Sequence, residues 1–248
     1  MKVEYHKHWS AYLDHDMELK VYGHAGKPVV VFPSARGTFY QFEDFGMVEA
    51  ARRFVEQGQI QLYTVSSNDG DAWLADDWIN LADRGRNHQK YDDYIVHEAI
   101  PFIREHSGAP DGFLATGCSM GAYHAANFFF RRPDIFDSVI ALSGLYGPQH
   151  FVGDYRDDNV YFNFPLLYLA NMDDPGYLER LHYSNIIICV GQGAWEEDCV
   201  RETRALEDVL QRLDVPAWVD YWGYDVNHDW PWWCKMWPYF LGNVTLSN

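Results

Sequence analysis

The chain has 248 residues, a formal net charge of −17, 48% hydrophobic residues and 17% aromatic residues. This length and apolar content predict one globular domain with a sizeable buried core, and they exclude a disordered chain. The acidic balance is spread along the chain and excludes binding to nucleic acid and to anionic membrane surfaces.

The chain offers little sign of an export or membrane signal. No stretch approaches the roughly 18 apolar residues of a membrane span, and the first residues lack the apolar run and cleavage site of a signal peptide. The four cysteines are too few and too scattered for a disulfide framework, and no CxxC pair occurs: Cys118, Cys189, Cys199 and Cys234. We therefore expect a cytoplasmic protein with reduced cysteines. A homo-oligomer is possible, and the sequence does not decide it.

Apolar strand-like runs alternate with amphipathic stretches along the chain. In chain order the pattern predicts strands at 19–24 and 28–34, a helix at 45–58, a strand at 60–67, a helix at 91–108, a strand at 112–119, a helix at 120–132, strands at 138–144 and 185–191, a helix at 198–214, a strand at 217–223 and a helix at 231–243. This alternation predicts a mostly parallel central sheet of about eight strands with helices on both faces.

One stretch, residues 145–183, breaks this rhythm and is rich in Tyr, Phe, Asp and Asn. It follows a predicted strand, so it is expected to lie over the carboxyl ends of the strands, where open α/β sheets bind ligands. We interpret it as a small lid-like insertion in the single domain.

A candidate nucleophile lies in the segment TGCSMGAYHAA, where Ser119 stands two positions from Gly117 and from Gly121. A strand precedes this serine and a small-residue helix follows, so the reversal imposes a strained backbone and leaves room only for glycine at the flanking positions. The helix start also brings N–H groups and positive dipole next to the hydroxyl. The alternative is a tight turn with serine as a helix cap. The neighbouring Cys118 is expected to be a small buried side chain.

A serine hydroxyl needs a general base to attack a carbonyl at neutral pH. The segment around Ser119 resembles the nucleophile turn of α/β-hydrolases, and this resemblance implies a base in the loop after the final strand. His228 lies in the loop YDVNHDWPWW after the last predicted strand, and it is the only histidine after His182. Chain order therefore selects His228, and the alternative is a surface histidine beside an aromatic cluster.

The imidazole needs a carboxylate to orient it and to stabilise its charged form. Three acids follow the strand at 185–191 in GQGAWEEDC. Asp198 is suited to cap the next helix. Glu196 is nearest the strand end, beside a tryptophan that would exclude water, and we select it with Glu197 as the alternative. Asp225, in the histidine loop, is a further candidate.

Acyl transfer also needs two backbone N–H groups that point at the developing oxyanion. Met120, directly after the nucleophile, is expected to supply one. The second N–H group is expected from Ser34 or Ala35, in the loop that follows the residues PVVVF. Pro33, in the same loop, has no N–H and cannot donate.

Two motifs carry a family resemblance: GCSMG at 117–121 and NHDWPWW at 227–233. With the order serine, acid, histidine, the chain resembles an α/β-hydrolase. More closely, it resembles the putative-esterase family of S-formylglutathione hydrolases, feruloyl and acetylxylan esterases and mycolyltransferases, over residues 28–241. The resemblance implies an α/β-hydrolase fold and a small-molecule ester or thioester substrate. Two departures stand out: FPSARG replaces the His-Gly that often follows the third strand, and Ala194 stands where the family usually has aspartate. The acidic role then passes to Glu196 or Glu197.

The leading hypothesis is a serine carboxylesterase that forms an acyl-enzyme on Ser119. An acyltransferase with the same triad is the first alternative, and a non-catalytic binding protein on the same scaffold is the second. Four tryptophans are candidates for substrate binding: Trp73, Trp78, Trp195 and Trp230. Arg84 is a weaker candidate for a substrate carboxylate. The sequence has no HExxH, P-loop or GxGxxG motif, so neither metal nor cofactor is expected.

Overall fold

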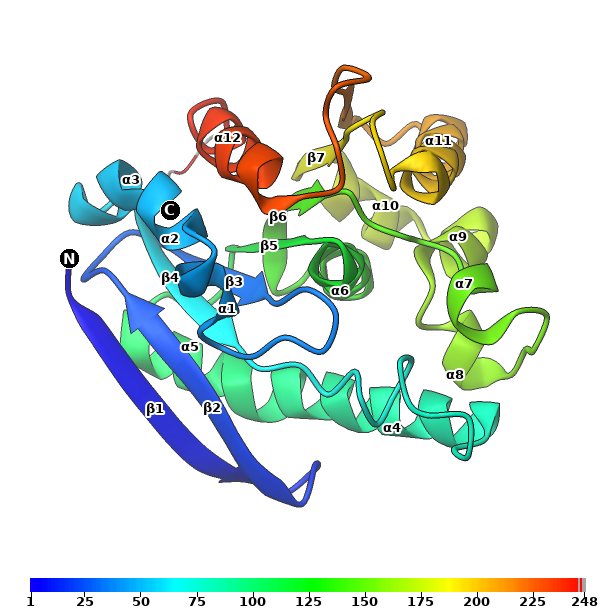
Figure 1. Cartoon of the computed structure of the whole chain (residues 1–248), viewed down its shortest axis with the longest axis horizontal. Helices are drawn as coiled ribbons and strands as arrows, with labels where there is room; N and C mark the ends of the chain where they lie inside the picture. Colours follow the sequence, from blue (N-terminus) through cyan, green and yellow to red (C-terminus); the bar gives the residue numbers. More distant parts are fainter. Residues whose placement is uncertain (245, 247–248) are drawn as a thin grey trace.

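The computed structural model describes residues 1–244 and 246, which form an α/β fold around one eight-stranded sheet (Figure 1). The sheet order is β1-β2-β4-β3-β5-β6-β7-β8. The strands are β1 (Val3–Ser10), β2 (His15–Tyr22), β3 (Lys27–Phe32), β4 (Ile60–Val65), β5 (Phe113–Cys118), β6 (Phe136–Leu142), β7 (Asn185–Val190) and β8 (Trp218–Tyr221). The β1–β2 and β2–β4 pairs are antiparallel and the other pairs are parallel. The predicted mostly parallel sheet of about eight strands is confirmed.

Helices cover both faces of this sheet. The helices are α1 (Gln41–Asp44), α2 (Met47–Ala50), α3 (Arg52–Glu56), α4 (Leu81–Tyr94), the π-helix η1 (Ile95–Ala99), α5 (Ile100–Ser107), α6 (Met120–Arg131), α7 (Gln149–Val152), α8 (Asp158–Tyr161), α9 (Pro165–Tyr168), the 3-10 helix η2 (Leu169–Asn171), α10 (Pro175–His182), α11 (Glu197–Arg212) and α12 (Trp230–Leu241). One core cluster joins α4, α5, α6 and α11 to the sheet, and another joins α1–α3 and α12 to its opposite face. Strands β3, β4 and β5 are buried along their whole length, as expected for parallel strands covered on both faces.

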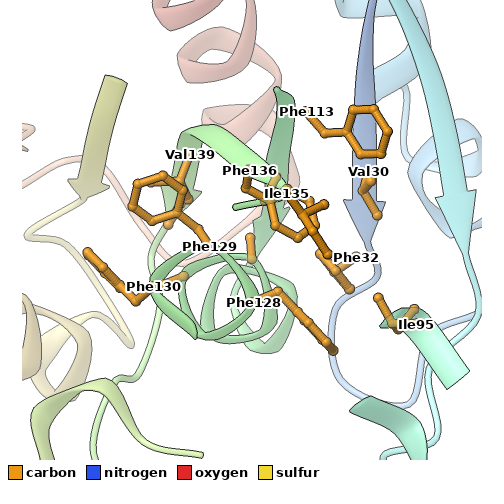
Figure 2. Close-up of a cluster of buried hydrophobic side chains, with 14 of the residues drawn as sticks. Val30, Phe32, Ile95, Phe113, Phe128, Phe129, Phe130, Ile135, Phe136 and Val139 are labelled. Carbon is orange, nitrogen blue, oxygen red and sulfur yellow. The ribbon is translucent and has the colours of Figure 1, made fainter. Parts of the chain in front are cut away.

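The helix α6 is fixed against the sheet by a dense aromatic core (Figure 2). Phe128, Phe129 and Phe130 are fully buried, and the ring of Phe128 stacks on Phe32 of β3 at 4.9 Å. Each fully buried side chain of this size contributes about 1.5–3 kcal/mol. The helix begins one residue after Ser119, so this packing holds the candidate nucleophile in place.

Three elements differ from the sequence prediction. The helix expected at 91–108 begins at Leu81, where the Asn80 side chain accepts the Asp83 N–H at 2.9 Å, and it passes through the π-helix η1. The helix expected at 45–58 divides into α2 and α3 at Ala51. The edge strand β1 was not predicted, because its polar residues point inward while apolar ones, such as Trp9, are exposed. A pattern of this kind gives no hydrophobic-inside signal.

Residues 145–183 contain α7, α8, α9, η2 and α10. In Figure 1, α7, α8 and α9 lie together on the right of the view, and α10 lies nearer to β7. Phe151, Val160 and Phe164 from this segment pack on Trp73 and Tyr123 in a small separate cluster. Within the described residues, every helix is too short or too polar to cross a bilayer.

Candidate active site

Ser119 lies on a sharp turn between β5 and α6. Its φ of 57° and ψ of −121° are values that a residue other than glycine rarely adopts. The turn brings the chain close to β3, so a Cβ on Gly121 would overlap the Phe32 carbonyl oxygen, and one on Gly117 would overlap the Gly121 backbone. The predicted reason for both glycines, lack of space, agrees with this geometry.

The structure brings Ser119, His228 and Glu196 together from three loops. His228 Nε2 lies 2.9 Å from Ser119 Oγ, and His228 Nδ1 lies 3.1 Å from Glu196 Oε2. Both distances are within hydrogen-bonding range. In this arrangement the imidazole can take the serine proton while the carboxylate stabilises the resulting charge.

The carboxylate of Glu196 is fully buried although the residue lies directly beside the exposed Trp195. Its second oxygen, Oε1, accepts the Ser143 hydroxyl at 2.6 Å, and Trp233 Nε1 donates to the same hydroxyl oxygen at 3.0 Å. Trp233 also lies edge-on to the His228 ring, with centroids 4.9 Å apart. The sequence analysis missed Ser143 and Trp233, whose role depends on packing between distant segments. The alternative acid, Glu197, is exposed at the start of α11.

The loops that carry the acid and the histidine are joined to each other by backbone contacts. Asn227 Oδ1 accepts the Ala194 N–H at 2.8 Å, and the His228 N–H donates to the Ala194 carbonyl at 3.0 Å. The Gly193 N–H also donates to the Val226 carbonyl at 2.8 Å. Ala194, where the family usually has an acid, thus helps to fix the loop that presents Glu196.

Cys199 is the nearest thiol to this triad, with its Sγ 3.9 Å from His228 Nδ1. Burial raises its pKa, so the thiol is neutral at pH 7. Cys118 is fully buried as predicted, and burial raises its pKa well above the ordinary value. Neither cysteine is therefore suited to act as a thiolate nucleophile.

The loop after β3 distinguishes between the two expected oxyanion donors. The Ser34 N–H donates to Gln41 Oε1 at 2.8 Å and is therefore engaged, whereas Ala35 lines the cavity next to Ser119. Met120, on the other side, lines the same cavity and begins α6. The backbone N–H groups of Ala35 and Met120 have no acceptor among the described residues. Of the two candidates on this loop, the geometry favours Ala35.

A buried pair supports the loop that carries Ala35. The Arg36 N–H donates to Asp69 Oδ2 at 3.0 Å, and Asp69 Oδ1 lies 2.7 Å from His124 Nε2. Asp69 and His124 are almost completely buried, and His124 belongs to α6. This pair connects the loop after β3 to the helix that begins at the nucleophile. His124 falls within the helix predicted at 120–132, and the sequence analysis gave it no role.

The cavity beside Ser119 has a volume of about 280 Å³. This is slightly below the range of about 300–1,000 Å³ that drug-sized ligands occupy. Polar groups in its wall come from Ser119, His150, Asp198 and His228. Apolar side chains form most of the wall, and the larger ones are Leu74, Met120, Leu145, Phe151 and Trp195. Leu145, His150 and Phe151 come from the segment that was predicted to cover the site.

The expectation that four tryptophans line the site holds for Trp195 alone. Trp73 is buried and donates its indole N–H to Tyr123, so it supports the cavity from within the core. Trp78 is exposed and lies outside the cavity lining. Trp230 stacks on Phe45 at 4.4 Å and packs at the start of α12. Large aromatic side chains mostly serve the core, and of these four Trp73 follows that rule.

Arg84 also lies away from the cavity. It is buried in α4, where its guanidinium donates to the carbonyl groups of Ile79 and Asp76. These two bonds close a local turn, so the side chain is not available for a substrate carboxylate.

Comparison with known proteins relates the chain to one family. The model of the putative esterase family matches residues 10–236. No curated protein sequence gives a match.

Many solved structures share the fold. A ferulic acid esterase has a TM-score of 0.76 at 18% identity, with 98% of this chain and 97% of that chain covered. An S-formylglutathione hydrolase from Agrobacterium tumefaciens has a TM-score of 0.75 at 17% identity, with 97% and 93% covered. FphF, a fluorophosphonate-binding serine hydrolase of Staphylococcus aureus, has a TM-score of 0.73 at 15% identity, with 97% of both chains covered. At these identities the likeness establishes the α/β-hydrolase fold.

Proposed function

Because the chain belongs to the putative esterase family and is a serine esterase acting on esters or thioesters, we propose that it is a carboxylesterase for small esters with an apolar acyl group. The hydrogen-bonded series from Ser119 through His228 to Glu196 is the observation that carries this proposal. It also weighs against a non-catalytic binding protein, because every group that acyl transfer requires is within reach.

The reaction proceeds in two half-reactions on Ser119. His228 Nε2 takes the hydroxyl proton as Oγ attacks the carbonyl carbon, and the N–H groups of Met120 and Ala35 stabilise the oxyanion. The C–O bond to the leaving alcohol breaks as His228 returns the proton to it. A water molecule, deprotonated by His228, then attacks the acyl-enzyme and releases the acid and free Ser119. Glu196 keeps Nδ1 protonated and stabilises the imidazolium in both steps.

The size and lining of the cavity support the choice of substrate. A volume of about 280 Å³ with mostly apolar walls suits a compact aliphatic or aromatic acyl group. The similar ferulic acid esterase suggests a methyl ferulate ester as one member of a test panel, beside short p-nitrophenyl esters.

Wild type and Ser119→Ala, assayed with this panel and a fluorophosphonate probe, test the proposal. We expect turnover and labelling in wild type only. Turnover retained by Ser119→Ala would refute a serine nucleophile. Product analysis with added alcohol separates the acyltransferase alternative, since formation of a new ester in place of the acid would favour it.

We propose three further properties of the protein. The segment 145–183 is proposed to act as a lid, because Leu145, His150 and Phe151 line the cavity. A cytoplasmic location is supported by the four free cysteines, as structural disulfides are rare in that compartment. A homo-oligomer remains a prediction that light scattering can test.

A further inference from the structure

Away from the esterase site, polar side chains without partners are concentrated between the edge strand β1 and the helix formed by α4, η1 and α5. Four buried side-chain atoms here lack a hydrogen-bond partner among the described residues: His6 Nε2, His8 Nε2, Tyr94 OH and Glu98 Oε2. A fifth, Glu4 Oε1, has only the exposed Lys2 ammonium as a partner. Buried polar groups nearly always have partners, and an orphaned group can mark the place of an ion. The adjoining π-helix is a local irregularity of a kind that often accompanies functional sites.

Three of the side chains in this region converge on one point. Glu4 and His6 are two residues apart on β1 and point to the same face, and His106 approaches them from α5. Glu4 Oε1 lies 3.5 Å from His106 Nε2, and Glu4 Oε2 lies 3.8 Å from His6 Nε2. One ligand atom from each of the three residues falls within 4.8 Å of the others. Ligands at 2.0–2.1 Å around a tetrahedral Zn²⁺ are separated by about 3.4 Å, so the three side chains would have to move together by up to about 1.4 Å.

The hydrogen bonds behind His106 are compatible with the tautomer that binds a metal through Nε2. The Tyr63 hydroxyl donates to Gln61 Oε1 at 2.9 Å, so its oxygen can accept a hydrogen bond from the N–H at His106 Nδ1, and the two atoms lie 2.9 Å apart. When the ring is neutral, this hydrogen bond leaves the lone pair of Nε2 directed at the Glu4 carboxylate, where a bound cation can be shared by the two groups. An outer hydrogen bond on the second ring nitrogen is the usual support of a metal-binding histidine.

We propose that Glu4, His6 and His106 form a Zn²⁺ site that links the edge strand β1 to α5, with water as the fourth ligand. Two imidazoles and one carboxylate form a donor set that suits zinc and related divalent metals. Lys2 competes for this carboxylate, with Nζ 2.6 Å from Glu4 Oε1, but its side chain is 60% exposed and can turn into solvent. The bound metal would hold the outermost strand against the body of the protein.

The experiment uses full-length protein freed of metal by a chelator and titrated with Zn²⁺ by calorimetry and with Co²⁺ by visible absorption. We expect one equivalent to bind and the thermal midpoint to rise with added Zn²⁺, because a ligand of the folded state stabilises it. His6→Ala and His106→Ala should each weaken binding by more than about 100-fold, and Tyr63→Phe by about 10-fold or more. Glu4→Gln serves as an additional ligand variant if either alanine variant is poorly folded.

Two controls separate this site from other acidic or thiol-containing places on a chain of net charge −17. His97→Ala removes an exposed histidine from the same helix, and His228→Ala removes the group formed by Glu196, Cys199 and His228. Both controls should bind zinc as wild type does. Absence of binding in wild type, or loss in His228→Ala with retention in His6→Ala and His106→Ala, would overturn the proposal.

Discussion

Replacing Glu196 with glutamine removes one negative charge from the proposed triad and leaves its volume unchanged. The amide can still accept the Ser143 hydroxyl, which keeps the side chain in place. The carboxylate it replaces is fully buried, with Oε2 3.1 Å from His228 Nδ1. A full charge pair about 4 Å apart interacts by about 4 kcal/mol at an effective dielectric constant of about 20. That energy corresponds to a rate factor of roughly 10³.

Loss of the carboxylate also removes the acceptor that selects the reactive tautomer of His228. Removal of the acid from a triad in other serine hydrolases lowers kcat by about 10⁴. We therefore expect kcat for p-nitrophenyl acetate to fall by about 10³ to 10⁴ in Glu196→Gln. KM should change little, because Glu196 is not part of the cavity lining.

Glu197→Gln is the matched control, since it changes the adjacent, exposed glutamate in the same way. It should keep near wild-type kcat, and thermal melting of both variants checks that they are folded. A Glu196→Gln enzyme within ten-fold of wild type, or an equal loss in Glu197→Gln, would refute the assignment of the acid.

The remaining predictions concern the cavity, the loop after β3 and the insertion. Trp195 is exposed at the cavity, so Trp195→Ala should raise KM for aryl esters and change the free energy of unfolding by less than about 0.5 kcal/mol. Trp73 is buried, so Trp73→Ala should lower the free energy of unfolding in urea by about 3–5 kcal/mol. Asp69→Asn should lower kcat by up to about 10²-fold, because the loop that carries Ala35 would be misplaced. Asp71→Asn, at an exposed position, is the control. A lower melting temperature with unchanged kcat would instead indicate a purely structural role for Asp69. Burial raises the pKa of Glu202, so the folded state holds its proton more tightly than the unfolded state; the stability of wild type relative to Glu202→Gln should therefore fall as pH rises from about 4.3 towards 7, and a constant difference in urea midpoints would contradict this.

Much of the fold was predictable because the buried parallel strands are continuous apolar runs. Strands β3, β5 and β7 are read directly from PVVVF, FLATG and NIIICV, since a strand covered on both faces admits few polar residues. The edge strand β1 was not predicted, because a strand at the edge of the sheet need not be a continuous apolar run. The polar inner face formed by Glu4 and His6 is also what makes it a candidate metal site.

By itself the sequence determined the candidate nucleophile turn, the candidate histidine and their order along the chain. Local sterics require glycine at 117 and 121 around a strained serine, and His228 is the single histidine in the loop after the final strand. These constraints act over a few residues, so they are legible in a linear pattern.

Only the tertiary structure distinguished between alternatives that are adjacent in the sequence. Glu196 and Glu197 carry the same functional group. The fold buries the side chain of Glu196 against Ser143 and leaves that of Glu197 exposed. Ser34 and Ala35 are likewise distinguished by Gln41, because its side-chain oxygen accepts the N–H of Ser34. Contacts between segments far apart in the chain determine which atom points into the cavity, and no local pattern records such contacts.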